Sequence, residues 1–182
     1  MKTTQMSATQ VSARPIHTVL GILIALSLAV GPAVAQPARS AAEERAYKEL
    51  NALYKGDYRA AFVQKKPELF LKHIDPGFTS TSIEGFDFDA TKLREFFTAM
   101  FTTMVRTIEH NVTIEDVDVA ANGEITAVVT LYTLIEFKGR KGGTYFVTTV
   151  GTYRDTFVRT PGGLIEVRAQ QLRNQTTTAP RP

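Results

Sequence analysis

The sequence predicts an α+β protein in which three N-terminal helices precede a curved antiparallel sheet of four long strands plus a short one. Up to about Arg106, apolar residues recur at spacings of three and four, the period of an amphipathic helix. After Arg106 they alternate with polar residues, the period of a strand with one buried face. Short turn sequences separate these later segments, and such turns join antiparallel strands. Helices followed by a run of strands are typical of the α+β class.

The composition indicates a folded domain without disulfides. The chain has 182 residues, of which 43% are hydrophobic and 21% are charged, and these values are typical of globular rather than disordered proteins. This length suits a single domain. Because the sequence contains no Cys, disulfide bonds, thiolate catalysis and Cys-based metal sites are excluded.

Residues 1–35 are expected to form a cleavable signal peptide. They contain no Asp or Glu, and Lys2 and Arg14 precede the uncharged run 19–30. Ala33-Val34-Ala35 then matches an A-x-A cleavage site before Gln36. The alternative is an uncleaved membrane anchor, but the run is much shorter than the ~20 residues that span a bilayer. We therefore expect a secreted or periplasmic protein with no stable membrane insertion after cleavage.

Removal of this leader leaves 19 Lys and Arg against 18 Asp and Glu. The charges are mixed along the chain, and no basic stripe interleaved with aromatic residues is present. Such a stripe is the usual mark of nucleic-acid binding. The sequence therefore predicts no nucleic-acid partner.

The helical half divides into three segments after a flexible lead-in at 36–42. The first helix is expected from Glu43 to about Gln64, with Gly56 weakening its middle. Pro67 ends that helix and begins a second, short one. Asp75-Pro76-Gly77 is a turn signal, and 78–82 is a short β-prone segment.

The third helix follows a loop at 84–89, and either Asp89 or Thr91 can cap it. Its apolar residues are spaced to form one buried stripe, which we interpret as core packing. They are Leu93, Phe96, Phe97, Met100, Met104 and Val105.

Four long strands complete the predicted domain, which spans 43–173. Asn122-Gly123 is a strong signal for a type I′ hairpin turn. A shift in the alternation near Asp116 indicates a β-bulge. The tail 174–182 is expected to be disordered. The expected strands are 108–119, 125–137, 144–159 and 164–172, with further turns at 139–143 and 161–163.

Three stretches resemble the nuclear transport factor 2-like superfamily, in particular its SnoaL-like and ketosteroid-isomerase-like branch. They are ELNALYKGDYRAAFVQKKPELFLKHIDPGFTSTS, the helix around LREFF, and the hairpin GTYRDTFVRTPGGLIEVRAQQ. The resemblance implies a cone-shaped, cystatin-like α+β domain with a pocket between the sheet and the first and third helices. It also implies a homodimer formed through the sheet. Members include isomerases, cyclases, dehydratases and non-catalytic modules, so the fold leaves the function open.

The strand 144–159 presents one aromatic face and one face rich in Thr and Val. We interpret the first, which contains Tyr153 and Asp155, as the cavity face, and the second as the outer surface of a homodimer. Asp155 matches the inward acid of ketosteroid-isomerase-like proteins. In an apolar pocket such an acid can stay protonated and donate to a developing oxyanion, or it can be a structural hydrogen-bonding group.

The general base of those isomerases has no counterpart here, because the matching position is Thr81, whose hydroxyl is not basic enough. His110 shares the apolar face of its strand and is a candidate acid or base, or a half-buried structural histidine. The candidate catalytic residues are Asp155, His110 and Tyr58. The candidate ligand-binding residues are Tyr54, Tyr58, Phe97, Thr81, Tyr153 and Asp155. No metal site and no cofactor are expected.

Three functions remain open on these observations. The favoured one is an exported module that binds a small apolar molecule without catalysis. The second is a small enzyme that performs acid/base chemistry on a carbonyl compound. The third is a structural homodimer whose cone is filled with side chains.

Overall fold

The computed structural model describes residues 39–139 and 142–180, so the predicted leader and residues 36–38 lie outside the described residues. The first helix, α1 (Ala41–Leu53), begins two residues earlier than expected. Ser40 caps it in a capping box: its hydroxyl accepts from the Glu43 backbone N–H, and the Glu43 carboxylate accepts from the Ser40 N–H. Residues 40–42 therefore belong to the folded domain.

The predicted first helix is present, but its middle is a π-helical segment. The helix continues from α1 through η1 (Tyr54–Tyr58) into α2 (Arg59–Gln64). Gly56 lies in η1, where the sequence suggested a weak point. Lys65 ends the helix in the left-handed conformation, with φ of 56°. Segments of π-helix often occur at functional sites, and η1 carries both candidate tyrosines.

Two further helices match the predicted second and third helices. α3 (Pro67–Leu71) begins at Pro67, as expected. α4 (Ala90–Thr103) is capped by Asp89, whose carboxylate accepts from the Lys92 backbone N–H at 2.8 Å. Assigning Met104 and Val105 to this helix was wrong: Met104 is already extended and begins the next strand. The β-branched Thr102 and Thr103 weaken the last turn of the helix, and the β-branched Val105 favours strand after it.

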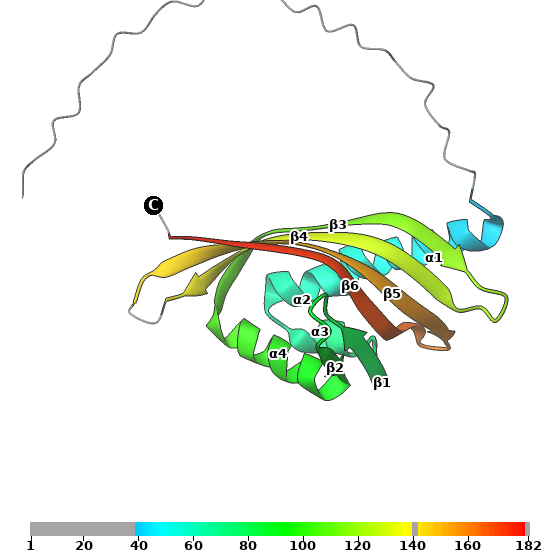
Figure 1. Ribbon diagram of the computed structural model, residues 1–182, viewed down its shortest axis with the longest axis horizontal. Helices are drawn as coiled ribbons and strands as arrows, with labels where there is room; N and C mark the ends of the chain where they lie inside the picture. The colour runs from blue at the N-terminus through cyan, green and yellow to red at the C-terminus, as the bar shows by residue number, and fades with distance from the viewer. Residues whose placement is uncertain (1–38, 140–141, 181–182) are drawn as a thin grey trace, which may run out of the picture. The chain divides into compact units, whose positions relative to one another are not determined.

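The sheet contains the four predicted long antiparallel strands and two short ones (Figure 1). Its order is β2-β1-β6-β5-β4-β3, and β1 runs parallel to β6. The additional short strand, β2, lies in the segment expected to be a loop. The strands are β1 (Ile74–Thr81), β2 (Asp87–Asp89), β3 (Met104–Val119), β4 (Ile125–Lys138), β5 (Thr144–Thr160) and β6 (Gly163–Pro180).

Local features of the sheet confirm one prediction and correct another. The register shifts between Ile114 and Asp116, which confirms the bulge. The 120–124 turn is not type I′, because that type needs two residues with positive φ and only Gly123 has one there, at 86°. Asn122 lies outside the left-handed region, and its side chain accepts from the Glu124 N–H at 3.0 Å.

The expectation of a disordered tail was also wrong for the described residues. Strand β6 continues to Pro180 and pairs with β5 over its whole length, for example Asn174 with Gly151 and Thr178 with Val147. The polar tail contains three consecutive β-branched threonines, Thr176 to Thr178. Such residues suit an exposed strand, and the open side of β5 supplies the backbone partners.

The helices cover the concave face of the sheet (Figure 1). One core cluster joins α1 and η1 to β3, β4, β5 and β6 around Leu50 and Phe157, both fully buried. A second joins α2 and α4 to β3 and β4 around Phe62 and Phe97. No helix in the described part of the chain is long and apolar enough to cross a bilayer.

Candidate functional site

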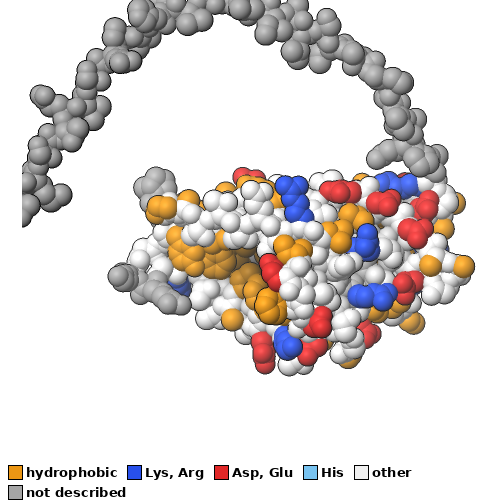
Figure 2. Space-filling model, in the orientation of Figure 1, with side chains coloured by type: hydrophobic (Ala, Val, Ile, Leu, Met, Phe, Trp, Pro, Cys, Tyr) orange, Lys and Arg blue, Asp and Glu red, His pale blue; other side chains and the backbone are white. Residues whose placement is uncertain are grey.

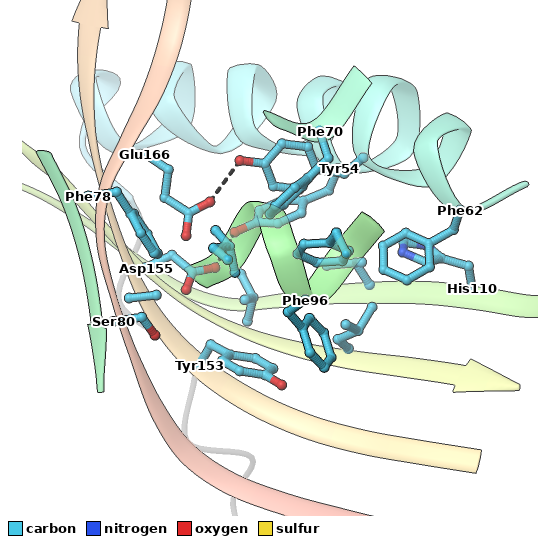
Figure 3. Close-up of a pocket in the computed structure, with 17 residues that line it drawn as sticks. Tyr54, Phe62, Phe70, Phe78, Ser80, Phe96, His110, Tyr153, Asp155 and Glu166 are labelled. Atoms are coloured by element: carbon cyan, nitrogen blue, oxygen red, sulfur yellow. Dashed lines mark hydrogen bonds between the residues drawn. The ribbon is translucent and has the colours of Figure 1, made fainter. Parts of the chain in front are cut away.

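A cavity of about 210 Å³ lies between the helices and the concave face of the sheet. Figure 2 shows hydrophobic side chains gathered along a hollow in this view, and Figure 3 shows the residues around the cavity. Its walls are mostly aromatic and aliphatic, with a few polar groups. The principal lining residues are Tyr54, Tyr58, Phe62, Phe70, Phe78, Ser80, Phe96, Phe97, His110, Val129, Tyr153, Asp155 and Glu166.

Two tyrosine–carboxyl pairs form one end of this cavity. The Tyr54 hydroxyl donates to Asp155 Oδ2 at 2.5 Å, and the Tyr58 hydroxyl donates to Glu166 Oε2 at 2.7 Å (Figure 3). Both tyrosines come from η1, and their rings meet edge to face at 5.2 Å. The π-helical turn therefore directs both hydroxyls toward the acids of β5 and β6.

The strand register explains why both acids point inward. Asp155 shares its face of β5 with Tyr153 and Phe157, as predicted. Glu166 lies directly opposite the buried Phe157, and the register shifts at the next position. Without that shift Asp155 would face Arg168; with it Asp155 faces Ala169. The bulge thus keeps Arg168 away from the two acids.

Burial changes the protonation of these groups. Asp155 is 6% exposed and Glu166 is 5% exposed. Burial raises the pKa of Asp155 to about 7, against a smaller lowering by the hydrogen bond from Tyr54. Burial, and then the charge of Asp155, raise the pKa of Glu166 well above its usual range. The pair therefore retains protons at pH values where ordinary carboxyl groups are fully ionised.

His110 also lines the cavity but stands apart from the acids. Its ring packs on Phe62 with 4.6 Å between the ring centroids, and burial lowers the pKa of His110 to about 4. The imidazole is therefore neutral near pH 7. Thr133 of β4 pairs with His110 of β3 on one side and with Thr149 of β5 on the other. Asp155 lies six residues farther along β5 than Thr149, which is roughly 20 Å along the strand. The structure does not bring His110 and Asp155 to a common point.

The structure places some of the other predicted site residues in the cavity and one of them outside it. Phe97 and Tyr153 line the cavity with Tyr54, Tyr58 and Asp155. Thr81 is not among the lining residues: it is exposed, and its hydroxyl donates to Asp87 Oδ1 at 2.9 Å. Its neighbour Ser80 lines the cavity instead, because successive residues of a strand point to opposite faces. The catalytic roles of Asp155, His110 and Tyr58 stay predictions.

Sequence analysis missed Glu166, because it expected a three-residue turn at 161–163 and only a turn of two residues gives the register that brings Glu166 inward. The two-residue turn at 161–162 sets Phe157 opposite Glu166. With this turn, an inward Phe157 implies an inward Glu166. No group of three or more His, Cys, Asp or Glu side chains arranged to hold a metal occurs within 39–139 and 142–180.

At the level of sequence, no family model and no curated protein matches the chain. Similarity appears among solved structures. A candidate scytalone dehydratase from Novosphingobium aromaticivorans has a TM-score of 0.63 at 15% identity, covering 78% of this chain and 95% of that one. A conserved protein from Planctomyces limnophilus has a TM-score of 0.59 at 12% identity, covering 74% and 98%.

A third similar structure is the hexachlorocyclohexane dehydrochlorinase LinA-type3 from Novosphingobium barchaimii. It has a TM-score of 0.54 at 11% identity, covering 77% of this chain and 92% of that one. At such identities the likeness concerns the fold alone. It confirms the expected α+β fold, a curved antiparallel sheet with helices before it, which these structures share and which the resemblance to the nuclear transport factor 2-like superfamily implied.

Proposed function

We propose that this protein binds a small, largely apolar molecule in the cavity, with one polar group of that molecule at the tyrosine–carboxyl end. The observation that carries the proposal is the combination of an open interior and a polar end that is fixed by two hydrogen bonds. Apolar walls with a few convergent polar groups are the usual form of a small-molecule site. The alternative of a cone filled with side chains does not fit the cavity.

The cavity volume limits the size of the molecule. A cavity of roughly 150 Å³ holds benzene, and drug-sized ligands occupy roughly 300–1,000 Å³. At about 210 Å³, the interior suits a molecule of one or two rings. Phe96, which lines the cavity and is 54% exposed, lies where such a molecule would enter from solvent.

The test is a thermal-shift screen of one- and two-ring compounds, with steroids and fatty acids included as larger probes. A ligand at about 100 times its Kd adds about 2.7 kcal/mol of stability, which raises Tm by several degrees. Ala169→Leu adds bulk to the cavity wall and should abolish the shift. Ala179→Leu, the same change at an exposed position of β6, should leave it intact. No shift with any compound would refute ligand binding.

A second candidate function is acid/base catalysis, and the raised pKa of Asp155 favours it. A carboxyl group that titrates near neutral pH can both accept and donate protons. A candidate dehydratase and a dehydrochlorinase are among the similar solved structures. The test is exchange of the α-hydrogens of 2-indanone for deuterium. Catalysis predicts faster exchange with wild type than with Asp155→Asn; binding alone predicts the buffer rate for both.

Export is part of this proposal. The charge pattern of 1–35 and the A-x-A sequence before Gln36 support removal of the leader. Mass spectrometry of protein recovered from the medium or the periplasm should give a chain beginning at or near Gln36. An intact N-terminus on membrane-bound protein would instead support the uncleaved anchor.

A further inference from the structure

The hydrogen bonds at the polar end of the cavity restrict which polar group a ligand can present. This step rests on the function proposed above. A tyrosine hydroxyl has one hydrogen, and both Tyr54 and Tyr58 use theirs on a carboxyl oxygen. Neither hydroxyl has a hydrogen left for a ligand. The two tyrosines therefore offer the interior only acceptor oxygens, and each carboxyl group offers acceptor oxygens once it has lost its proton.

The two acids also have no counter-charge within the described part of the chain. Neither Asp155 nor Glu166 forms an ion pair there, and no Lys or Arg is among the described residues that line the cavity. One hydrogen bond, from a tyrosine, reaches each carboxyl group. Burying two carboxyl groups without a cation is unfavourable, and in the free protein retained protons offset this cost.

The walls beside the acids suit a cation. The rings of Tyr54 and Tyr58 meet edge to face, and Phe70 packs against Tyr58 with 4.5 Å between the ring centroids. Phe97 packs against Phe70 at 4.6 Å, so aromatic rings continue from the acids along the cavity. Aromatic faces attract ammonium groups, most strongly where water is excluded. His110, which also lines the cavity, is neutral near pH 7 and does not repel a cation.

We propose that the ligand of this cavity is an organic amine with a one- or two-ring apolar body, bound as its ammonium ion. The ammonium N–H groups donate to Asp155 and Glu166, and the apolar body packs against the aromatic rings. As the ammonium enters, the acid pair releases a proton to solvent, so the charge of the cavity is balanced. Binding therefore strengthens as the pH rises from 5 to 7.5.

The other titratable groups near the acids do not reverse the expected increase of amine affinity with pH. Tyr54 and Tyr58 on η1 and Tyr153 on β5 face them, and burial raises the pKa of each tyrosine, so all three stay neutral. His73 lies 6.0 Å from the Tyr58 ring and is bonded outward to Asp57. Asp57 also forms an ion pair with Lys72.

The experiment compares four compounds that share one bicyclic skeleton: 2-aminoindane, 2-indanol, 2-indanone and indane. Calorimetric titrations of the wild-type protein at pH 5, 6 and 7.5, each in two buffers of different ionisation enthalpy, give Kd and the number of protons released. We expect the amine to bind at least about tenfold more tightly than the alcohol at pH 7.5. Its affinity should rise by up to about tenfold per pH unit, with proton release.

Variants provide a second measurement. Asp155→Asn and Glu166→Gln should each weaken amine binding roughly 30-fold and change the Kd of indane less than about threefold. Asp118→Asn, at an exposed acid of β3, should change neither. If the acid variants do not fold, the wild-type pH series decides alone.

The possible outcomes separate this inference from the proposed function. If 2-indanol or 2-indanone binds as tightly as the amine, or the amine binds without pH dependence and proton release, the amine proposal is overturned and ligand binding stands. If none of the four compounds binds, the amine proposal is overturned as well. The broader thermal-shift screen then decides ligand binding by itself.

Discussion

Gly151 and Tyr153 shape the wall of the cavity at the scale of single residues. The Tyr153 ring lies across Gly151, where an added Cβ would be 2.6 Å from Tyr153 Cε2. The Tyr153 hydroxyl accepts from Gln171 Nε2 at 3.2 Å, which holds the ring in place. Glycine at 151 therefore leaves the space that the Tyr153 ring occupies.

Gly151→Ala should force the Tyr153 ring away from this position. We expect a loss of about 1–3 kcal/mol in the free energy of unfolding, typical of overpacking, and altered binding of any cavity ligand. Adding Tyr153→Ala to this variant should remove the clash, so the two changes should be less than additive in urea denaturation. Gly162→Ala, with its nearest atom at 3.7 Å, is the control. Equal losses in Gly151→Ala and Gly162→Ala would contradict this interpretation.

The protonation of Asp155 predicts a pH dependence of stability. Its pKa is raised in the folded protein from 3.8 to about 7, so the folded state holds a proton that the unfolded state has lost. The stabilisation is present below pH 4 and is lost as the pH rises to about 7. It amounts to at most about 4 kcal/mol, since one pKa unit is 1.36 kcal/mol.

Asp155→Asn should remove this dependence. As the pH rises from 5 to 8, the unfolding free energy of the wild type should therefore fall relative to that of the variant. Burial lowers the pKa of His110 to about 4, so His110 makes the folded protein less stable as the pH falls below 6.5. Both proteins contain His110, so its effect cancels when their unfolding free energies are subtracted. Parallel urea-denaturation curves at both pH values would show that Asp155 is ionised in the folded state.

Single residues also show what the sequence could predict about the site. Period-two alternation identified Asp155, and helical spacing identified Tyr54 and Tyr58. Their pairing could not be predicted, because it depends on the π-helical turn and on the bulge beside Phe157. Thr81 was misplaced by one residue, and on a strand one residue reverses the face.

At the scale of elements, η1 carries the two tyrosines of the candidate site and also contains Gly56, which weakens the helix. Gly56 has helical backbone geometry and open space where a Cβ would lie. Gly56→Ala should therefore stabilise the protein by about 0.5–1 kcal/mol, because Ala loses less backbone entropy. Gly123→Ala is the matched control: with φ of 86°, it should destabilise the protein. Thermal unfolding measures both, and a destabilised Gly56→Ala would show that η1 requires Gly.

Element boundaries were predictable where local signals determine them. Asp89 and Pro67 begin helices because a cap and a fixed φ are local properties. The end of α4 and the length of β6 depend on pairing with distant strands. The extension of β6 to Pro180 uses the free edge of β5, and nothing in the polar sequence after Arg173 revealed that partner.

At the scale of the whole domain, the curved sheet has a second face that the helices do not cover. On β5 this face presents Thr148, Val150 and Thr152. We propose that it forms the homodimer interface that the sequence suggested. Light scattering coupled to size exclusion should give twice the chain mass for the wild type and the single chain mass for Val150→Arg. A monomeric wild type would exclude this interface.

The central claim is that the concave side of the sheet encloses an accessible binding cavity. The most direct measurement is an NMR titration of the wild-type protein with 2-indanol, following methyl signals on both faces. The account predicts saturable shifts at Val112, Val129 and Leu131, which line the cavity, with Val150 and Val158 unchanged. Shifts confined to Val150 and Val158, or no saturable shift at any methyl group, would contradict it.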